Sequence, residues 1–98
     1  MAEQTQLEKL SKGRRAELME SVPDWERDGE VISREFVFED FRGSLAFVER
    51  VADLAEEQSH HPDIFISINH VHLFLTTHKV HRLTEKDFAL ASAIDRLL

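Results

Sequence analysis

The sequence predicts a single α+β domain, residues 1–98, in which a four-stranded antiparallel sheet accompanies three helices in the order αββαββα. Segments with strand-like alternation occur in two adjacent pairs, and segments with helical spacing precede, separate and follow these pairs. Strands outside crossover units, with the helices placed to one side, favour an antiparallel sheet. A length of 98 residues and a hydrophobic content of 42% fit one folded domain.

The first helix and the first strand pair are bounded by strong local signals. Residues 11–20 are predicted to form a helix, which Pro23 ends because proline cannot continue the hydrogen-bond ladder. Residues 24–27 and 31–38 are predicted to be strands, and Asp28-Gly29 between them is typical of a tight turn. Residues 31–38 alternate in polarity, so one face of this strand is expected to lie on the core.

A second helix is predicted from Asp40, a suitable N-cap, to about Gln58. Its apolar positions are spaced by four and three residues, as one helix face requires; they are Phe41, Leu45, Val48, Ala52 and Ala55, widened by Phe47, Val51 and Leu54. We expect this broad stripe to cover the sheet and still touch a partner helix.

A second hairpin and a last helix complete the chain. After Pro62, two alternating runs carry the apolar side chains Ile64, Ile66 and Ile68, then Val71, Leu73 and Leu75, with Asn69-His70 as the expected connection. Residues 84–87 resemble a capping box, so the last helix is expected to follow with Phe88, Ala91, Ile94 and Leu98 at helical spacing.

The composition excludes several classes of protein. The chain has 12 Lys and Arg against 19 Asp and Glu, a charge of −7, which argues against a general nucleic-acid binder. Without cysteine there is no disulfide, thiol catalysis or thiolate metal site. No apolar run approaches the roughly 20 residues of a membrane span, and the N-terminus lacks a signal peptide's apolar stretch. We expect a cytoplasmic protein that contacts neither membrane nor nucleic acid directly.

All six histidines fall between positions 60 and 81. In the predicted hairpin, His60 and His61 precede the first strand and His78 follows the second, so the three side chains meet at one end. Imidazoles on different sides of a small molecule can donate one proton and remove another near neutral pH. The alternative interpretation is a solvated surface loop.

Other interpretations of single residues stay open. Three histidines suit zinc, but neighbouring histidines rarely reach one ion; His70 and His72 could bind a metal adventitiously, and with His81 they are expected to face solvent. Asp87 can cap its own helix or orient a histidine. Trp25 is expected in the core, although a lone tryptophan beside a polar cluster can stack on a flat ring.

These residues resemble the pterin-4a-carbinolamine dehydratase family over nearly the whole chain. The most specific part is the run from Glu56 to Asp63 with its paired histidines and proline, followed at the right distance by Thr77-His78. Further matching positions are Trp25, Phe36, Phe38, Asp40, Phe41, Phe47, Val51, Ala52, Asn69, Val71, Leu73, Leu75, Leu83, Thr84 and Asp87.

The resemblance implies a compact α+β fold with a four-stranded antiparallel sheet and three helices, assembled as homodimers or homotetramers through sheet edges or helices. It implies dehydration of 4a-hydroxytetrahydropterins to quinonoid dihydropterins, which recycles the cofactor of aromatic amino acid hydroxylases, with no metal and no organic cofactor. The alternative it allows is a non-catalytic interaction module or dimerisation cofactor that keeps the fold.

The resemblance also implies roles for individual residues. His60, His61 and His78 would be the catalytic imidazoles, with Asp87 orienting one of them. We expect His61 and His78 to transfer the protons and His60 mainly to bind. The substrate-binding positions expected are Ser59, Pro62, Thr76, Thr77, Lys79 and Trp25.

Four departures from the family pattern, which involve five residues, make substrate preference an open question. Ser59 stands where the family often has Asp, and Ile68 where it often has an aromatic residue. Lys79 replaces a common acidic residue, and His81-Arg82 stands where a glycine usually precedes Leu-Thr. Because glycine adopts positive φ at little cost, the loop over residues 79–82 is expected to take a different path.

Overall fold

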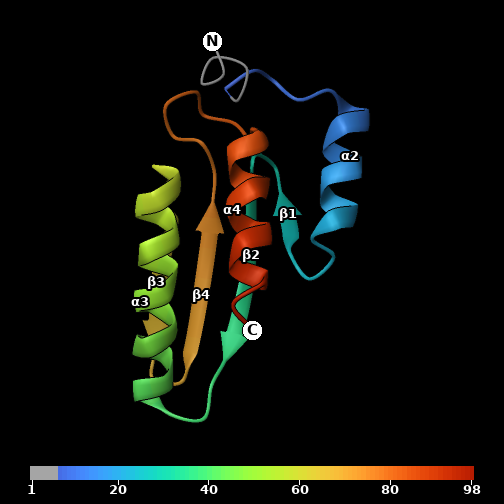
Figure 1. The fold of residues 1–98 in the computed structure, drawn as a ribbon. Helices are drawn as coiled ribbons and strands as arrows, with labels where there is room; N and C mark the ends of the chain where they lie inside the picture. The colour runs from blue at the N-terminus through green and yellow to red at the C-terminus, as the bar shows by residue number, and fades with distance from the viewer. Residues whose placement is uncertain (1–6) are drawn as a thin grey trace.

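A computed structural model describes residues 7–98 and confirms the predicted fold class. The elements are α2 (Lys12–Ser21), β1 (Glu26–Asp28), β2 (Val31–Val37), α3 (Phe41–Gln58), β3 (Asp63–Ser67), β4 (His70–Leu75) and α4 (Glu85–Asp95) (Figure 1). The observed order is therefore αββαββα, and the helices and strands lie within one to three residues of the predicted bounds.

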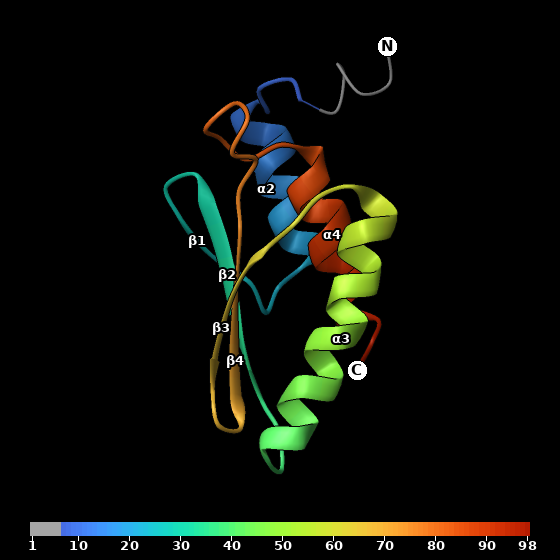
Figure 2. The same cartoon turned by 90° about the vertical axis from the view of Figure 1, so that its left-hand side faces the viewer.

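The sheet has the strand order β1-β2-β4-β3, and every neighbouring pair is antiparallel. All three helices cover the same face of the sheet, which leaves the other face open (Figure 2). The core lies between the two layers; its fully buried members include Val22, Ile32, Val51, Val71, Leu73, Leu75, Leu90 and Ile94. The second hairpin thus supplies the centre of the core through β4, while β3 forms one sheet edge.

Helix α3 packs with a face that differs in part from the predicted stripe. Its buried positions are Ser44, Phe47, Val51 and Ala55, whereas Phe41 is 50% exposed and Leu45 is 40% exposed. Ser44 is buried at no cost in hydrogen bonding because its hydroxyl donates to the main-chain oxygen of Ile68 at 2.8 Å. The apolar side chains of Phe41 and Leu45, in the first turns of α3, therefore remain exposed at the surface.

The connection of the second hairpin is shifted by one residue from the prediction. Ile68 and Asn69 form the turn, and His70 is the first residue of β4. Ile68 adopts φ 51° and is 71% exposed, so it does not extend the apolar face of β3 as predicted. The Asn69 amide donates to Phe38 at 3.1 Å and Phe38 N donates back to Asn69 at 2.8 Å, which fixes the turn.

Trp25 lies just before β1 rather than within a strand, and its side chain is only 2% exposed. Its indole donates to Asp95 Oδ1 at 2.8 Å, and Arg34 donates to the same oxygen at 2.7 Å. Arg34 thereby obtains a partner on the apolar face of β2, and the pair ties the end of α4 to the sheet. In the described part of the chain, no helix has the length and apolarity needed to span a bilayer.

Candidate active site

The end of α3 delivers the first histidine of the site. Ser59 caps the helix in the left-handed conformation, with φ 50° and ψ 43°. The next amide, of His60, donates to Ala55 at 3.0 Å, so the chain turns sharply across the helix end before Pro62 and β3. This turn directs the His60 side chain inward, where it is 8% exposed.

Asp87 lies in the first turn of α4 and is completely buried. Its Oδ2 accepts the main-chain N–H of Thr84 at 2.9 Å, which completes a capping box. Its Oδ1 lies 2.6 Å from Nε2 of His60. The two interpretations of Asp87 are therefore both realised, because each carboxylate oxygen serves a different partner.

Two buried threonine hydroxyls complete the environment of this carboxylate. Thr77 Oγ1 donates to Asp87 Oδ2 at 2.7 Å and lies 2.7 Å from Thr84 Oγ1. Since the single hydroxyl proton of Thr77 is used on Asp87, Thr84 must be the donor between the two threonines. Three groups thus aim hydrogens at Asp87, and burial without such partners would be costly for a carboxylate.

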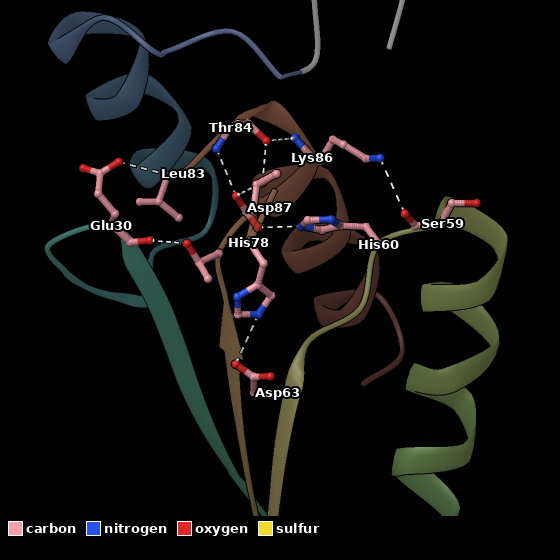
Figure 3. Close-up of polar contacts among 11 residues, drawn as sticks. Glu30, Ser59, His60, Asp63, His78, Leu83, Thr84, Lys86 and Asp87 are labelled. Carbon is pink, nitrogen blue, oxygen red and sulfur yellow. Dashed lines mark hydrogen bonds and ion pairs between the residues drawn. The ribbon is translucent and has the colours of Figure 1, made fainter. Parts of the chain in front are cut away.

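This arrangement defines how the His60 ring is held. An ionised carboxylate only accepts, so Nε2 of His60 carries a proton and donates it to Asp87. Whenever the ring is neutral, Nδ1 is then the nitrogen left to accept. Figure 3 shows His60 directed at Asp87 across the gap between the end of α3 and the start of α4.

The other two histidines of the cluster also meet carboxylates, but at the surface. His61 Nε2 lies 2.5 Å from Glu56 Oε2, and His78 Nε2 lies 3.5 Å from Asp63 Oδ2. The side chains of His61 and His78 are 62% and 66% exposed, so both rings can reach a ligand in solution. Exposed contacts of this kind contribute little to stability.

A cavity of about 290 Å³ brings most of the predicted site residues together. It is lined by Leu7, Ser59, His60, His61, Thr76, Thr77, His78, Lys79 and Lys86. This volume is at the lower end of the range for small-molecule sites. Asp87 lies behind His60, while Pro62 and Trp25 do not line the cavity, and Trp25 is held in the core by Asp95.

The segment over residues 76–83 is clamped from the first hairpin, which the sequence did not predict. The Thr76 hydroxyl donates to the main-chain oxygen of Glu30 at 2.6 Å, and the Glu30 carboxylate accepts from Leu83 N at 3.0 Å. Thr77 N donates to Arg82 O at 3.1 Å, so the segment closes on itself. His81 adopts φ 54°, in the left-handed region that glycine enters at little cost.

Two residues of the cavity were missed, Lys86 and Leu7. Lys86 lies within the predicted capping box, and its ammonium approaches the Ser59 carbonyl oxygen at 3.5 Å. Its neighbour Glu85 binds Arg14 of α2 at 2.7 Å and 3.0 Å, and this hydrogen bond raises the pKa of the Arg14 guanidinium. No sequence signal marks Leu7, whose main-chain oxygen accepts from Nη2 of Arg82 at 3.3 Å.

The remaining histidines lie elsewhere. His70 and His72 project from β4 on the open face of the sheet, where His72 stacks on Phe74 with ring centroids 4.3 Å apart. A larger hollow of about 520 Å³ lies on this face, but a single histidine, His72, lines it. Within residues 7–98, no three His, Asp or Glu side chains are grouped as metal ligands. The smaller cavity is therefore lined by three histidines, against one in the larger hollow.

The sequence of the chain matches known proteins over most of its length. The model of the family described as Pterin 4 alpha carbinolamine dehydratase matches residues 8–97. A relative from Thermomicrobium roseum, assigned provisionally to pterin-4-alpha-carbinolamine dehydratase, is 52% identical over 82 residues, which cover 84% of this chain and 88% of the relative. A relative from Chloroflexus aurantiacus with the same provisional assignment is 49% identical over 92% of this chain and 97% of its own length.

Solved structures agree. A transcriptional coactivator/pterin dehydratase from Brucella melitensis superposes with a TM-score of 0.86 at 29% identity, over 92% of this chain and 98% of that one. A pterin dehydratase-like protein identified as a RuBisCO assembly factor in the alpha-carboxysome superposes with a TM-score of 0.62 at 26% identity, over 74% of this chain and 84% of its own. On the family match, the identities and the shared fold, the chain belongs to the pterin-4a-carbinolamine dehydratase family.

Proposed function

We propose that the chain dehydrates a 4a-hydroxytetrahydropterin to a quinonoid dihydropterin, the reaction that recycles the cofactor of aromatic amino acid hydroxylases. The observation that carries this proposal is the convergence of His60, His61 and His78 on one cavity, with a buried carboxylate behind His60. Membership of the family and the relatives' provisional assignments support it.

The reaction needs two proton transfers. Hydroxide is a poor leaving group, so a protonated imidazole donates to the 4a-oxygen as the carbon–oxygen bond breaks, and water leaves. A neutral imidazole removes the proton from the adjacent ring nitrogen, whose electron pair forms the new carbon–nitrogen double bond. The two proton transfers and the loss of water complete this reaction, so it consumes no oxidant and needs no metal or organic cofactor.

The surroundings of the histidines favour a division of labour that differs from the expected one. His60 donates through Nε2 to Asp87, so its Nδ1 is the atom left to accept the ring proton. His78 is exposed and only loosely paired with Asp63, so its ring is free to bring a proton to the leaving oxygen. His61, held by Glu56 at the rim, then serves mainly in binding.

The test is the decay of the carbinolamine absorbance at neutral pH with the purified full chain. We expect decay well above the uncatalysed rate, and a loss of about 100-fold or more in His60→Ala or His78→Ala. Matched controls are His70→Ala and His81→Ala, which remove histidines outside the cavity and should keep the wild-type rate. A wild-type chain that leaves the uncatalysed rate unchanged would refute the proposal.

A second candidate function is a non-catalytic interaction module. The observation that favours it is the exposed apolar part of α3, where Phe41 and Leu45 stand at the surface, together with the structural neighbour that acts as an assembly factor. This candidate predicts no dehydration by the folded wild-type chain and a protein partner whose binding is lost in Leu45→Glu. The expected cytoplasmic location stays a prediction under both functions.

A further inference from the structure

Two lysines line the histidine cavity from different elements. Lys79 directly follows His78, and Lys86 lies in the first turn of α4 (Figure 3). Within residues 7–98 neither ammonium forms an ion pair, and the single hydrogen bond of Lys86 is the 3.5 Å contact to the Ser59 carbonyl. The cavity therefore presents two cations whose charge is not matched by a direct partner.

The carboxylates nearest to the cavity are already engaged. Asp87, Glu56 and Asp63 each contact one imidazole of the cluster, and none of them lines the cavity. A ligand in the cavity accordingly meets imidazole and ammonium groups rather than carboxylates. This local charge is opposite to that of the whole chain, which has a net charge of −7.

A third cation lies directly behind the lining. Arg82 donates from Nη2 to the main-chain oxygen of Leu7 at 3.3 Å, and Leu7 lines the cavity. Its Nε is buried and finds no hydrogen-bond partner among the described residues. The charge of this guanidinium adds to the positive field on the side of the cavity that Leu7 lines.

We propose that the site takes a pterin whose side chain carries a negative charge, a carboxylate or a phosphate, which Lys79 and Lys86 bind. This inference rests on the proposed function, because it concerns the substrate of the same site. The pterin ring is uncharged near neutral pH, so a neutral substrate offers no negative charge to the two ammonium groups. An anionic side chain would provide that charge in charge-assisted hydrogen bonds.

The test compares the binding of dihydroneopterin, dihydroneopterin monophosphate and dihydrofolate to the full chain by calorimetry. None of the three is a carbinolamine, so binding is measured without turnover. We expect the phosphate and carboxylate ligands to bind roughly tenfold more tightly than neutral dihydroneopterin, since each partly exposed ion pair contributes a few-fold. The preference should shrink as salt is raised, because salt screens exposed charges.

The decisive variant is the double substitution Lys79→Gln with Lys86→Gln, in which the ratio of the affinities should fall to about one. The matched control is Lys9→Gln with Lys12→Gln, which removes the same charge outside the cavity lining and should keep the ratio. Equal affinities for neutral and charged ligands in the wild type, no binding of any of them, or a preference that survives in the cavity variant would each overturn the inference.

The outcome is separable from that of the proposed function. Equal affinities together with rapid dehydration of a carbinolamine with a neutral side chain would remove the anionic side chain and leave the dehydratase. Selective binding of the charged ligands without dehydration of any carbinolamine would remove the dehydratase and leave an anion-selective pterin site.

Discussion

At the scale of single residues, Asp87 combines two tasks that the sequence presents as alternatives. One oxygen caps α4 through Thr84 N, and the other orients His60, while Thr77 adds a further donor. A carboxylate has lone pairs for all of these partners, and complete burial makes each of them valuable. Fold stability and the geometry of the proposed active site therefore depend on the same side chain.

Replacing Asp87 with asparagine should reduce both the stability of the fold and the rate of dehydration. The amide keeps the shape but turns one acceptor into a donor, so either Thr84 N or His60 loses its partner. We expect the free energy of unfolding to fall by about 1–3 kcal/mol. Because Asp87 does not line the cavity, kcat should fall by about 100-fold with little change in KM.

Chemical denaturation and steady-state dehydration kinetics measure the two effects. The control is Asp53→Asn, which makes the same change on the exposed face of α3 and should leave both quantities unchanged. A KM effect without a kcat effect would place Asp87 in binding instead of in the positioning of His60.

The sequence predicts the residues of this cluster better than their environments. Histidines at the two ends of a hairpin must come together, so the meeting of His60, His61 and His78 follows from strand order alone. Burial does not follow: His60 is enclosed and His61 is exposed, although they are neighbours, because successive side chains leave an extended chain in opposite directions. The environment of Trp25 could not be predicted either, because its hydrogen-bond partner Asp95 is far away in the sequence and no local pattern links the two residues.

At the scale of elements, the segment over residues 76–83 depends on Glu30 in the turn of the first hairpin. Glu30 contacts this segment near both ends, through Thr76 and Leu83. His78 and Lys79 lie between these two anchors, so the clamp restricts how far the segment that carries them can move. The pairing of β2 with β4 brings the two hairpins together and makes this contact geometrically accessible.

Glu30→Ala should loosen the segment without unfolding the domain. The main-chain contact to Thr76 remains, while Leu83 N loses its acceptor, so we expect a stability loss of about 0.5–1.5 kcal/mol. The Leu83 amide should exchange with deuterium markedly faster than in the wild type, as local opening becomes easier.

Hydrogen exchange followed by NMR provides the measurement for this variant. Glu26→Ala, in the exposed strand β1, is the control and should leave Leu83 protected. An unchanged exchange rate at Leu83 in Glu30→Ala would show that the side-chain clamp does not hold the segment.

At His81 we predict a substitution that raises the stability of the fold, whereas the two preceding substitutions lower it. The expectation that the loop over residues 79–82 takes a different path from its relatives stays a prediction. His81 is the one residue of this loop with a positive φ, at 54°. A residue with a Cβ atom costs about 1–2 kcal/mol in this conformation, and glycine avoids most of that cost. After the larger chain entropy of glycine in the unfolded state is subtracted, His81→Gly should raise the stability by about 0.5–1 kcal/mol.

Thermal denaturation of His81→Gly and Val80→Gly would check this assignment. Val80 is not among the residues with positive φ, so the same substitution there should lower the melting temperature. Destabilisation in both variants would contradict a left-handed His81.

The limits of element prediction have one physical origin. Element order follows from periodicity and turn signals, and it is correct throughout. The face that each element buries depends on its neighbours. Ser44 of α3 can be buried because its hydroxyl donates a hydrogen bond to Ile68 O, while Phe41 on the same helix is half exposed. Hydrophobicity alone predicts the opposite, a buried Phe41 and an exposed Ser44.

At the scale of the whole molecule, two of the surfaces that the three helices leave open carry exposed apolar side chains suited to contact between copies of the chain. One is strand β3, whose outer edge has no strand beside it within residues 7–98, with Phe65 64% exposed and Ile64 39% exposed. The other is the exposed apolar side of α3 around Phe41 and Leu45. A chain of 11.4 kDa buries a modest core, so association through such surfaces adds stability.

We predict that the wild-type chain associates through both surfaces, with β3 of two copies pairing edge to edge and the α3 faces joining the resulting dimers. An unprotected edge strand pairs readily with another chain, and an exposed helix stripe gains by covering its apolar side chains. Light scattering after gel filtration should then give four times the mass of one chain. Leu45→Glu, which places a charge in the helix contact, should halve that mass. Ile66→Pro combined with Leu45→Glu should give the 11.4 kDa monomer, because proline interrupts strand pairing.

Helical content by circular dichroism must be retained in each variant for the masses to be informative. The control is Glu49→Gln, an exposed position of α3 away from Leu45, which should keep the wild-type mass. A wild-type chain that is monomeric at all concentrations would refute both contacts. A dimer that persists in the double variant would refute pairing through β3, because its two chains would then be joined by a surface that neither substitution touches.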